Sequence, residues 1–200
     1  MNPTQNGREA KQSQEPTNES GKHTIDEVVS TPEERSHVVA VLREFSNVML
    51  STFQPGPNAW APQVQTRPMA VARLDDDGTM VFITQRDSAK VHSVAARRRG
   101  QVTVQSATRY ATLTGRLDVR DDRKLIREVW SKLNEVWLEG PDDPNAVALV
   151  FTPELAEIWD SSGRRGLKFL LASAKALITG DKEHDDDPEQ HVKVQMRDAR

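Results

Sequence analysis

The chain has 200 residues and a formal net charge of −3, from 27 lysines and arginines against 30 aspartates and glutamates. It contains no cysteine, which excludes disulfides, thiolate metal ligands and thiol nucleophiles. No apolar run approaches the roughly 18 residues of a membrane span, and the N-terminus has no apolar signal-peptide region. The sequence therefore predicts a soluble cytoplasmic protein with no membrane partner.

The two ends of the chain differ in composition from the rest. Residues 1–30 and 181–200 contain few large apolar side chains, so they bury too little apolar surface to offset the entropy of ordering the chain. We expect both to be disordered, and the second is also acidic. Residues 31–180 then form one domain with 20 basic and 18 acidic residues. Such an even balance, without a clustered basic face, argues against nucleic acid as a partner.

The first half of this domain is predicted to contain a helix, a hairpin and a second helix. Thr31, Pro32 and the two glutamates that follow predict a helix start, because a hydroxyl cap, an early proline and acidic residues all favour a helix N-terminus. Gly78 ends an Asp-rich hairpin connection, at a position that needs a positive φ. The elements expected after the first helix are strands over 47–53, 65–74 and 79–85, a proline-rich turn over 54–62 and a helix over 87–98.

In the second half, alternating and helical patterns predict another hairpin, a long helix and the last strands. The apolar stripe that includes Trp130 and Trp137 has helical spacing, so both tryptophans are expected in the core. The elements expected here are strands over 102–106 and 110–119, a helix over 125–137, strands over 146–152 and 156–159 and a helix over 167–178. Six or seven short strands with brief helices predict a mainly β, α+β fold of the barrel or sandwich type.

Residue chemistry alone offers one candidate binding feature. The five histidines lie too far apart for a metal site, and no glycine-rich phosphate loop is present. Ser88 and Lys90 stand where a strand ends and a helix begins, and a helix N-terminus with a nearby lysine favours an anion. The alternative is that Asp87 or Ser88 caps the helix and Lys90 is solvated. On these residues alone, the alternative is the simpler interpretation.

Several short segments, in unbroken order along the chain, resemble a known family. They are Thr66-Arg67-Pro68-Met69, Val81-Phe82-Ile83-Thr84, Asp87-Ser88-Ala89-Lys90, Thr114-Gly115-Arg116-Leu117, Asp121-Asp122-Arg123 and the ranges 137–144, 156–160 and 174–180. Together they resemble the pyridoxamine 5'-phosphate oxidase-like superfamily, and most closely its branch of FMN-binding general stress proteins. The resemblance covers about residues 31–180 and rests on the ordered set rather than on any single motif.

The resemblance implies a split β-barrel homodimer that holds one FMN at each of two symmetric interface sites. The residues that it assigns to the cofactor are Arg67, Pro68, Met69, Ile83, Thr84, Ser88, Lys90, Gln105 and Trp159. In this assignment Ser88 and Lys90 hold the phosphate, and Trp159 approaches from the partner subunit. The set suits a flavin, which needs a flat apolar slot, polar groups at the ring edge and an anion site at its tail.

Two departures from the true oxidases of the superfamily argue against oxidation of pyridoxamine phosphate. Ala72 stands where those enzymes place a basic residue, and residues 161–168 lack the histidine of their Arg-x-His-x-Arg substrate grip. The sequence leaves open a flavin-dependent oxidoreductase that acts on an unidentified small molecule, and a non-catalytic module that binds or senses flavin. A third alternative keeps the barrel and fills it with another cofactor, such as haem or a deazaflavin. No catalytic residue is assigned.

Overall fold

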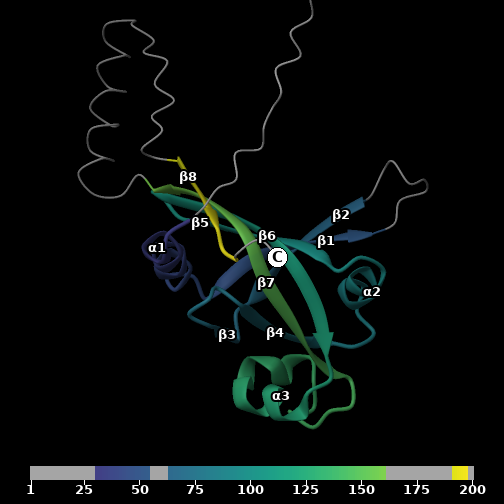
Figure 1. Ribbon diagram of the computed structural model, residues 1–200. Helices are drawn as coiled ribbons and strands as arrows, with labels where there is room; N and C mark the ends of the chain where they lie inside the picture. The colour runs from purple at the N-terminus through teal and green to yellow at the C-terminus, as the bar shows by residue number, and fades with distance from the viewer. Residues whose placement is uncertain (1–29, 55–62, 161–190, 198–200) are drawn as a thin grey trace, which may run out of the picture.

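The computed structural model describes residues 30–54, 63–160 and 191–197, which form one curled antiparallel sheet with helices packed against it (Figure 1). The strands are β1 (Asn47–Gln54), β2 (Gln63–Ala70), β3 (Arg73–Leu74), β4 (Met80–Gln85), β5 (Arg99–Gln105), β6 (Arg109–Arg120), β7 (Ala146–Asp160) and β8 (His191–Gln195). The helices are α1 (Pro32–Leu42), α2 (Ala89–Ala96), α3 (Arg123–Val129) and the 3-10 helix η1 (Lys132–Val136). None of the helices in these described ranges is long and apolar enough to cross a membrane.

Strand β7 pairs with three other strands. One side of it runs along β6, while on the other side residues 146–151 pair with β4 and residues 155–159 pair with β8. The change of partner falls at Pro153, which has no N–H to donate to a ladder. Beside it, the register of β6 shifts between Thr114 and Gly115. Such a shift bends a sheet and increases its twist, so the sheet curls at this point.

The curl brings the two ends of the sheet together. The strand order is β2-β1-β5-β6-β7-β4-β3, so β2 and β4 stand far apart in the hydrogen-bonded sequence of strands. Nevertheless β2 contacts β4, and Ala72, in the short connection between β2 and β3, donates its N–H to the carbonyl of Val81 in β4 at 2.9 Å. The sheet is therefore a barrel that is split along a seam between β2 and β4. This confirms the mainly β, α+β split barrel expected from the sequence.

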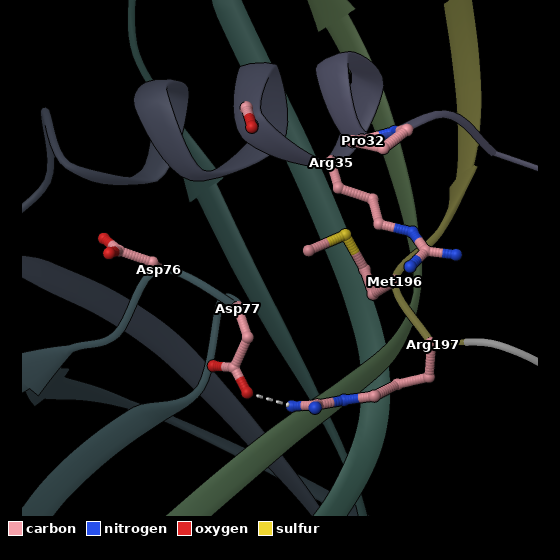
Figure 2. A pocket seen from close by; sticks show the side chains of 7 residues that line it. Pro32, Arg35, Asp76, Asp77, Met196 and Arg197 are labelled. Atoms are coloured by element: carbon pink, nitrogen blue, oxygen red, sulfur yellow. Dashed lines mark hydrogen bonds and ion pairs between the residues drawn. The ribbon is translucent and has the colours of Figure 1, made fainter.

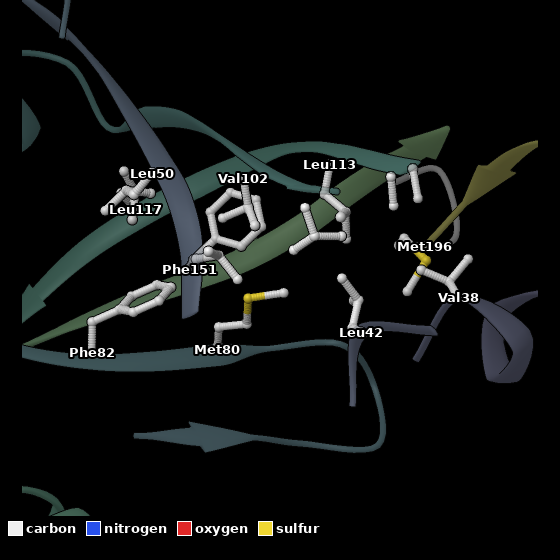
Figure 3. Close-up of a cluster of buried hydrophobic side chains, with 14 of the residues drawn as sticks. Val38, Leu42, Leu50, Met80, Phe82, Val102, Leu113, Leu117, Phe151 and Met196 are labelled. Carbon is white, nitrogen blue, oxygen red and sulfur yellow. The ribbon is translucent and has the colours of Figure 1, made fainter. Parts of the chain in front are cut away.

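Apolar side chains pack on both faces of the curled sheet, because successive strand residues point to opposite sides. Val81 belongs to the smaller cluster and Phe82 to the larger one. The larger cluster fills the inside of the curl and includes Val38, Leu42, Leu50, Met80, Phe82, Leu113, Leu117 and Phe151 (Figure 3). The smaller cluster packs α3 against β4 and β7 and includes Leu125, Ile126, Val129, Ala148 and Val150.

Several local features follow the sequence directly. The side chains of Thr31 and Glu34 cap each other's backbone N–H groups at 3.2 and 2.8 Å, which starts α1 where predicted. Gly78 has a φ of 81°, the left-handed conformation that the connection between β3 and β4 needs. The hairpin of β5 and β6 is also confirmed.

The long helix expected over 125–137 is wrong. Helix α3 ends at Val129, Trp130 has an extended backbone with ψ of 137°, and the chain continues as η1 after Ser131. The extended backbone lets Trp130 pack against the smaller cluster, while Gln85 Nε2 donates to the carbonyl of Trp137 at 3.1 Å. As a result Trp137 is 68% exposed, so its expected place in the core is wrong as well.

Strand boundaries also differ from the expected ones. The strand expected over 65–74 is two strands, because β2 pairs with β1 whereas β3 pairs with β4. The strands expected over 146–152 and 156–159 are one continuous strand, β7. The helix expected over 167–178 lies outside the described residues, as do residues 1–29.

The expected disorder of residues 181–200 is wrong for β8. The alternation of Val192, Val194 and Met196 is a strand pattern within a polar segment, and Val194 and Met196 are 1% and 4% exposed in the larger cluster. Ser30, also expected to be disordered, is buried, and its hydroxyl accepts the N–H of Gln195 at 2.7 Å. Strand β8 is thus ordered by pairing with β7 and by its contact with Ser30.

Gly115 tests the curl of the sheet. A Cβ at this position would lie 2.1 Å from the carbonyl oxygen of Thr152 and 2.9 Å from Cα of Pro153, and backbone atoms cannot move aside as a side chain can. We expect Gly115→Ala to destabilise the fold by about 1–3 kcal/mol or more. Gly140→Ala is the matched control, because no atom lies within 4 Å of its Cβ. Equal urea midpoints for the two variants would contradict this account of the curl.

Candidate functional site

A pocket of about 530 Å³ lies at the seam of the barrel. Its lining residues are Asn47, Arg67, Pro68, Met69, Ala70, Ile83, Thr84, Gln85, Lys90, Leu133, Asn134, Val136, Trp137 and Leu138. They come from β1, β2, the end of β4, the start of α2, and η1 with the two residues after it. The pocket therefore exists only because the curl brings β2 next to β4.

Arg67 stands on β2 opposite Leu50 of β1 and points to the inner side of the curl. Its guanidinium donates to the hydroxyl of Thr52 at 2.9 Å and to the side-chain carbonyl of Gln65 at 3.2 Å. Both acceptors are neutral. Burial lowers the pKa of Arg67 from its ordinary value, because the charged form loses contact with water.

Lys90 reaches the same pocket from the first turn of α2. Its Nζ donates to the hydroxyl of Thr84, at the end of β4, at 2.9 Å. Burial lowers the pKa of Lys90, and the positive charge of Arg67 lowers it further. The two cations are thus close enough to repel each other.

Among the described residues, no carboxylate pairs with either of these two charges. Within the part of the chain that the structure describes, neither Arg67 nor Lys90 forms an ion pair, although most other arginines of the barrel do. The lining of the pocket contains no aspartate or glutamate. Two half-buried cations without a counter-charge favour an anionic group, which would remove their repulsion and accept their hydrogen bonds.

Ser88 borders this site without lining it. It is the N-cap residue of α2, but its hydroxyl donates to the carbonyl of Gln85 at 2.7 Å and makes no cap hydrogen bond. Its side chain is therefore occupied with the end of β4. The neighbouring Lys90 is the residue of this turn that faces the pocket.

Exposed apolar side chains also line the pocket. Leu133, Val136 and Trp137 of the η1 segment are 68%, 69% and 68% exposed and all line the pocket. We call these three side chains the η1 wall. The amphipathic pattern predicts a helix face in the core at these positions, so it does not identify them as pocket residues. The Gly140-Pro141 stop close behind is a sequence signal of an irregular turn.

The loop after the η1 wall is held in place by charged groups. The guanidinium of Arg123 donates to the carbonyls of Asp143 and Ala146, each at 2.7 Å. The carboxylate of Asp143 accepts the N–H groups of Glu139 at 2.9 Å and Asn145 at 2.7 Å, and these hydrogen bonds lower its pKa. The backbone that carries Trp137 is thus fixed independently of the Trp137 side chain.

Gln105 and Trp159 lie outside the pocket. They occupy one row across the sheet, in which Gln105 of β5 pairs with Tyr110 of β6 and Tyr110 pairs with Trp159 of β7. The row is on the outer face, where Tyr110 is 42% and Trp159 is 37% exposed. Of the nine residues that the resemblance assigns to a cofactor, a single chain brings six together in the pocket: Arg67, Pro68, Met69, Ile83, Thr84 and Lys90.

A second pocket, of about 350 Å³, lies between α1, the turn before β4 and the end of β8 (Figure 2). Both of its aspartates are paired with arginines. Arg197 binds Asp77 at 2.8 Å and Thr79 at 2.9 Å, and Arg43 pairs with Asp76. The remaining charged residue of its lining, Arg35, donates its Nε to the carbonyl of Gln195 at 2.9 Å. This pocket therefore mixes acidic and basic groups, whereas both charged residues that line the seam pocket are cations.

The chemistry of the seam pocket defines the class of ligand that it fits. Two cations supply an anion site, and prolyl, methionyl and η1 side chains supply apolar walls. No lining residue is a carboxylate or a histidine, so the pocket offers no conventional acid–base pair. No cluster of metal-ligating side chains occurs within the described ranges. The residues fit a ligand that carries both an anionic group and an apolar body.

Comparisons with known proteins agree with this architecture. Residues 33–185 match the family model described as pyridoxamine 5'-phosphate oxidase like. No protein among those with curated descriptions matches the chain. A structure described as general stress protein 26 from Jannaschia sp. CCS1 is 27% identical, covers 82% of this chain and 99% of its own, and has a TM-score of 0.60.

Two further solved structures share the fold. The general stress FMN/FAD binding protein from Xanthomonas citri is 25% identical, covers 66% of this chain and 92% of its own, and has a TM-score of 0.53. General stress protein 26 from Bacillus anthracis str. Sterne is 19% identical, covers 63% of this chain and 92% of its own, and has a TM-score of 0.54. At 19% identity, that structure supports the fold alone.

The lowered pKa of Lys90 has a consequence for stability. Unfolding returns Lys90 to its ordinary pKa of 10.5, so between the lowered value and 10.5 the unfolded chain binds more protons than the folded one. Stability therefore rises with pH in this window. The Lys90→Met variant has no titrating group at this position, so it lacks this rise. The unfolding free energy of wild type minus that of Lys90→Met should grow with pH, by less than about 1 kcal/mol because Lys90 is half-buried.

Urea unfolding of both proteins at steps from about pH 7 to about pH 10 measures this difference. Lys124→Met is the control, because its side chain is 87% exposed on α3. If the unfolding free energy of wild type minus that of Lys90→Met stays constant or shrinks with rising pH, the pKa of Lys90 is not lowered by burial and by the charge of Arg67.

Proposed function

The chain belongs to the pyridoxamine 5'-phosphate oxidase-like family, and we propose that it is a flavin-binding protein that holds FMN in the seam pocket. The family fold alone does not determine the function, because one fold hosts many activities. The observation that carries the proposal is the pair of cations Arg67 and Lys90, which have only neutral hydrogen-bond partners among the described residues and line a pocket with apolar side chains. A flavin phosphate is a dianion of the kind that such a pair binds.

Each lining residue has a definite task in this proposal. Lys90 and Arg67 bind the phosphate, with Ser88 and the free N–H groups of the α2 N-terminus beside it. Pro68 and Met69 of β2 and Ile83 of β4 contact the apolar parts of the cofactor. When bound, the flavin supplies reversible electron transfer, which no side chain of this pocket supplies itself.

The choice of FMN is supported by the size of the anion site. Two cations suit one terminal phosphate, and the Xanthomonas citri neighbour is described as binding FMN or FAD. A haem in the same barrel is less well supported, because haem iron most often takes a histidine and no lining residue is a histidine. A deazaflavin shares the flavin shape and is distinguished by identifying the bound molecule.

The two candidate activities, an oxidoreductase and a flavin-binding or sensing module, need different chemical groups from the protein. A flavin-dependent oxidoreductase acting on a small molecule needs only a second substrate beside the cofactor, whereas proton transfer would need an acid or base. The lining has no carboxylate or histidine, which favours a flavin-binding or sensing module, or electron transfer without protein acid–base groups. Steady-state reduction by NADH or NADPH separates the two. The absence of cysteine from all 200 residues agrees with the cytoplasmic location that we propose.

We further propose that the protein is a homodimer through the outer face of β1, β5, β6 and β7. Met49 is 42%, Tyr110 is 42% and Trp159 is 37% exposed on this face, and apolar side chains that gather on one face mark interfaces. Within one chain Gln105 and Trp159 do not reach the seam pocket. Contact of these two residues with the cofactor, as the resemblance implies, therefore needs a second chain.

Sedimentation of the full chain tests the dimer. We expect a stable dimer at micromolar concentration, because a second copy would cover the exposed apolar side chains of this sheet face. Tyr110→Arg places an unpaired charge in the middle of the proposed interface and should shift the protein to monomers. A stable wild-type monomer at micromolar concentration would contradict both the dimer and the shared site.

Lys90→Ala tests the phosphate site. The variant removes one charge-assisted contact, worth roughly 1.5–3 kcal/mol, so FMN should bind about ten- to a hundredfold more weakly. Riboflavin has no phosphate and should bind wild type and variant alike. Lys124→Ala changes a side chain that is 87% exposed on α3 and does not line the pocket, so it should change neither affinity. Titration by flavin fluorescence measures all of these constants, and an FMN constant within about twofold of wild type would place the phosphate elsewhere.

A further inference from the structure

The η1 wall is the most exposed group of large apolar side chains in the described part of the chain. Leu133, Val136 and Trp137 are each more than two-thirds exposed, whereas Val64, the next in rank, is 55% exposed. All three residues line one pocket rather than being scattered over the surface. Exposure of such a group costs free energy in water, at about 25 cal/mol per Å² of apolar surface. A ligand in the pocket would recover it.

The backbone of the η1 wall is held by contacts with other residues. Its side chains are therefore not needed to fix this segment. Gln85 Nε2 donates to the carbonyl of Trp137 at 3.1 Å, and Leu138, only 6% exposed, anchors the next residue in the smaller cluster. Arg123 and Asp143 fix the loop that follows. The Trp137 side chain takes no part in these contacts, so it is available for a ligand.

The end of β4 sets the wall against the anion site. Thr84 and Gln85 are consecutive strand residues, so their side chains point to opposite faces. Thr84 accepts the hydrogen bond of Lys90, and Gln85 holds Trp137. One strand end therefore fixes the cation on one side and the apolar wall on the other, and both line the same pocket.

From this arrangement we propose that Trp137, with Leu133 and Val136 beside it, binds the planar ring of the ligand and makes the pocket selective for an uncharged aromatic body. The inference rests on the proposed flavin function and adds to it the residue that recognises the ring. None of the η1-segment residues that line the pocket is charged, so this wall accepts flat apolar groups and gives no contact to a second anion. An indole ring stacks on such a group in an offset arrangement.

Trp137→Ala, titrated with FMN and with riboflavin, tests the proposal by flavin fluorescence. Both ligands carry the ring, so both should bind about tenfold more weakly and by the same factor. This differs from Lys90→Ala, which should affect FMN alone. Trp137→Phe keeps an aromatic surface and should retain affinity within about threefold. Trp130→Phe is the matched control, because Trp130 packs against the smaller cluster, does not line the pocket, and has an indole N–H without a partner.

The outcomes separate the inference from the function on which it rests. If wild type binds FMN but Trp137→Ala binds both flavins within about twofold of wild type, the ring lies elsewhere, and the inference is overturned while the function stands. If wild type binds neither flavin, the proposed function fails, and the inference with it. If Trp137→Ala changes sedimentation but not affinity, the wall is a subunit contact instead. Trp137→Phe keeps the test decisive if the alanine variant does not fold.

Discussion

The partner switch of β7 at Pro153 is the constraint on which the site depends. One strand of 15 residues pairs with β4 on one half and with β8 on the other, while β6 pairs with its residues 148–160. Gly115, without a Cβ, allows the bulge beside the switch. The resulting curl brings β2 against β4 across a seam. The pocket, its cations and the start of α2 all lie at that seam, so the function that we propose is a consequence of barrel closure.

The seam pocket carries a cost in the free protein. Arg67 and Lys90 are partly desolvated, their pKa values are lowered, and the neutral side chains of Thr52 and Thr84 accept their hydrogen bonds where carboxylates would neutralise them. The exposed η1 wall adds an apolar cost of a different kind. Both costs are removed by one molecule with an anionic tail and a flat ring. Such costs are common at binding sites. A bound ligand offsets them, because it supplies the counter-charge and the apolar contacts that the free protein lacks.

Local sequence rules predict those parts of the fold in which neighbours along the chain decide the structure. The capping box of Thr31, the turn at Gly78 and the β5–β6 hairpin are of this kind. The rules fail where a distant partner decides: Trp130 leaves the helical pattern to pack beside α3, and β8 is ordered by β7 and Ser30 although its segment is polar on average. For the site, the resemblance to the family identified Arg67 and Lys90. The helical spacing of apolar residues placed Trp137 in the core instead. Periodicity does not distinguish a side chain that faces a core from one that faces a pocket.

The identity of the molecule that the protein carries from the cell tests the central claim most directly. The full chain is purified without added cofactor, its visible absorption spectrum is recorded, and the released chromophore is identified by mass. Our account predicts a flavin spectrum, with FMN at about one molecule per chain or taken up to that ratio on incubation with FMN. A protein that releases haem or a deazaflavin, or one that is colourless and stays so with excess FMN, would contradict it.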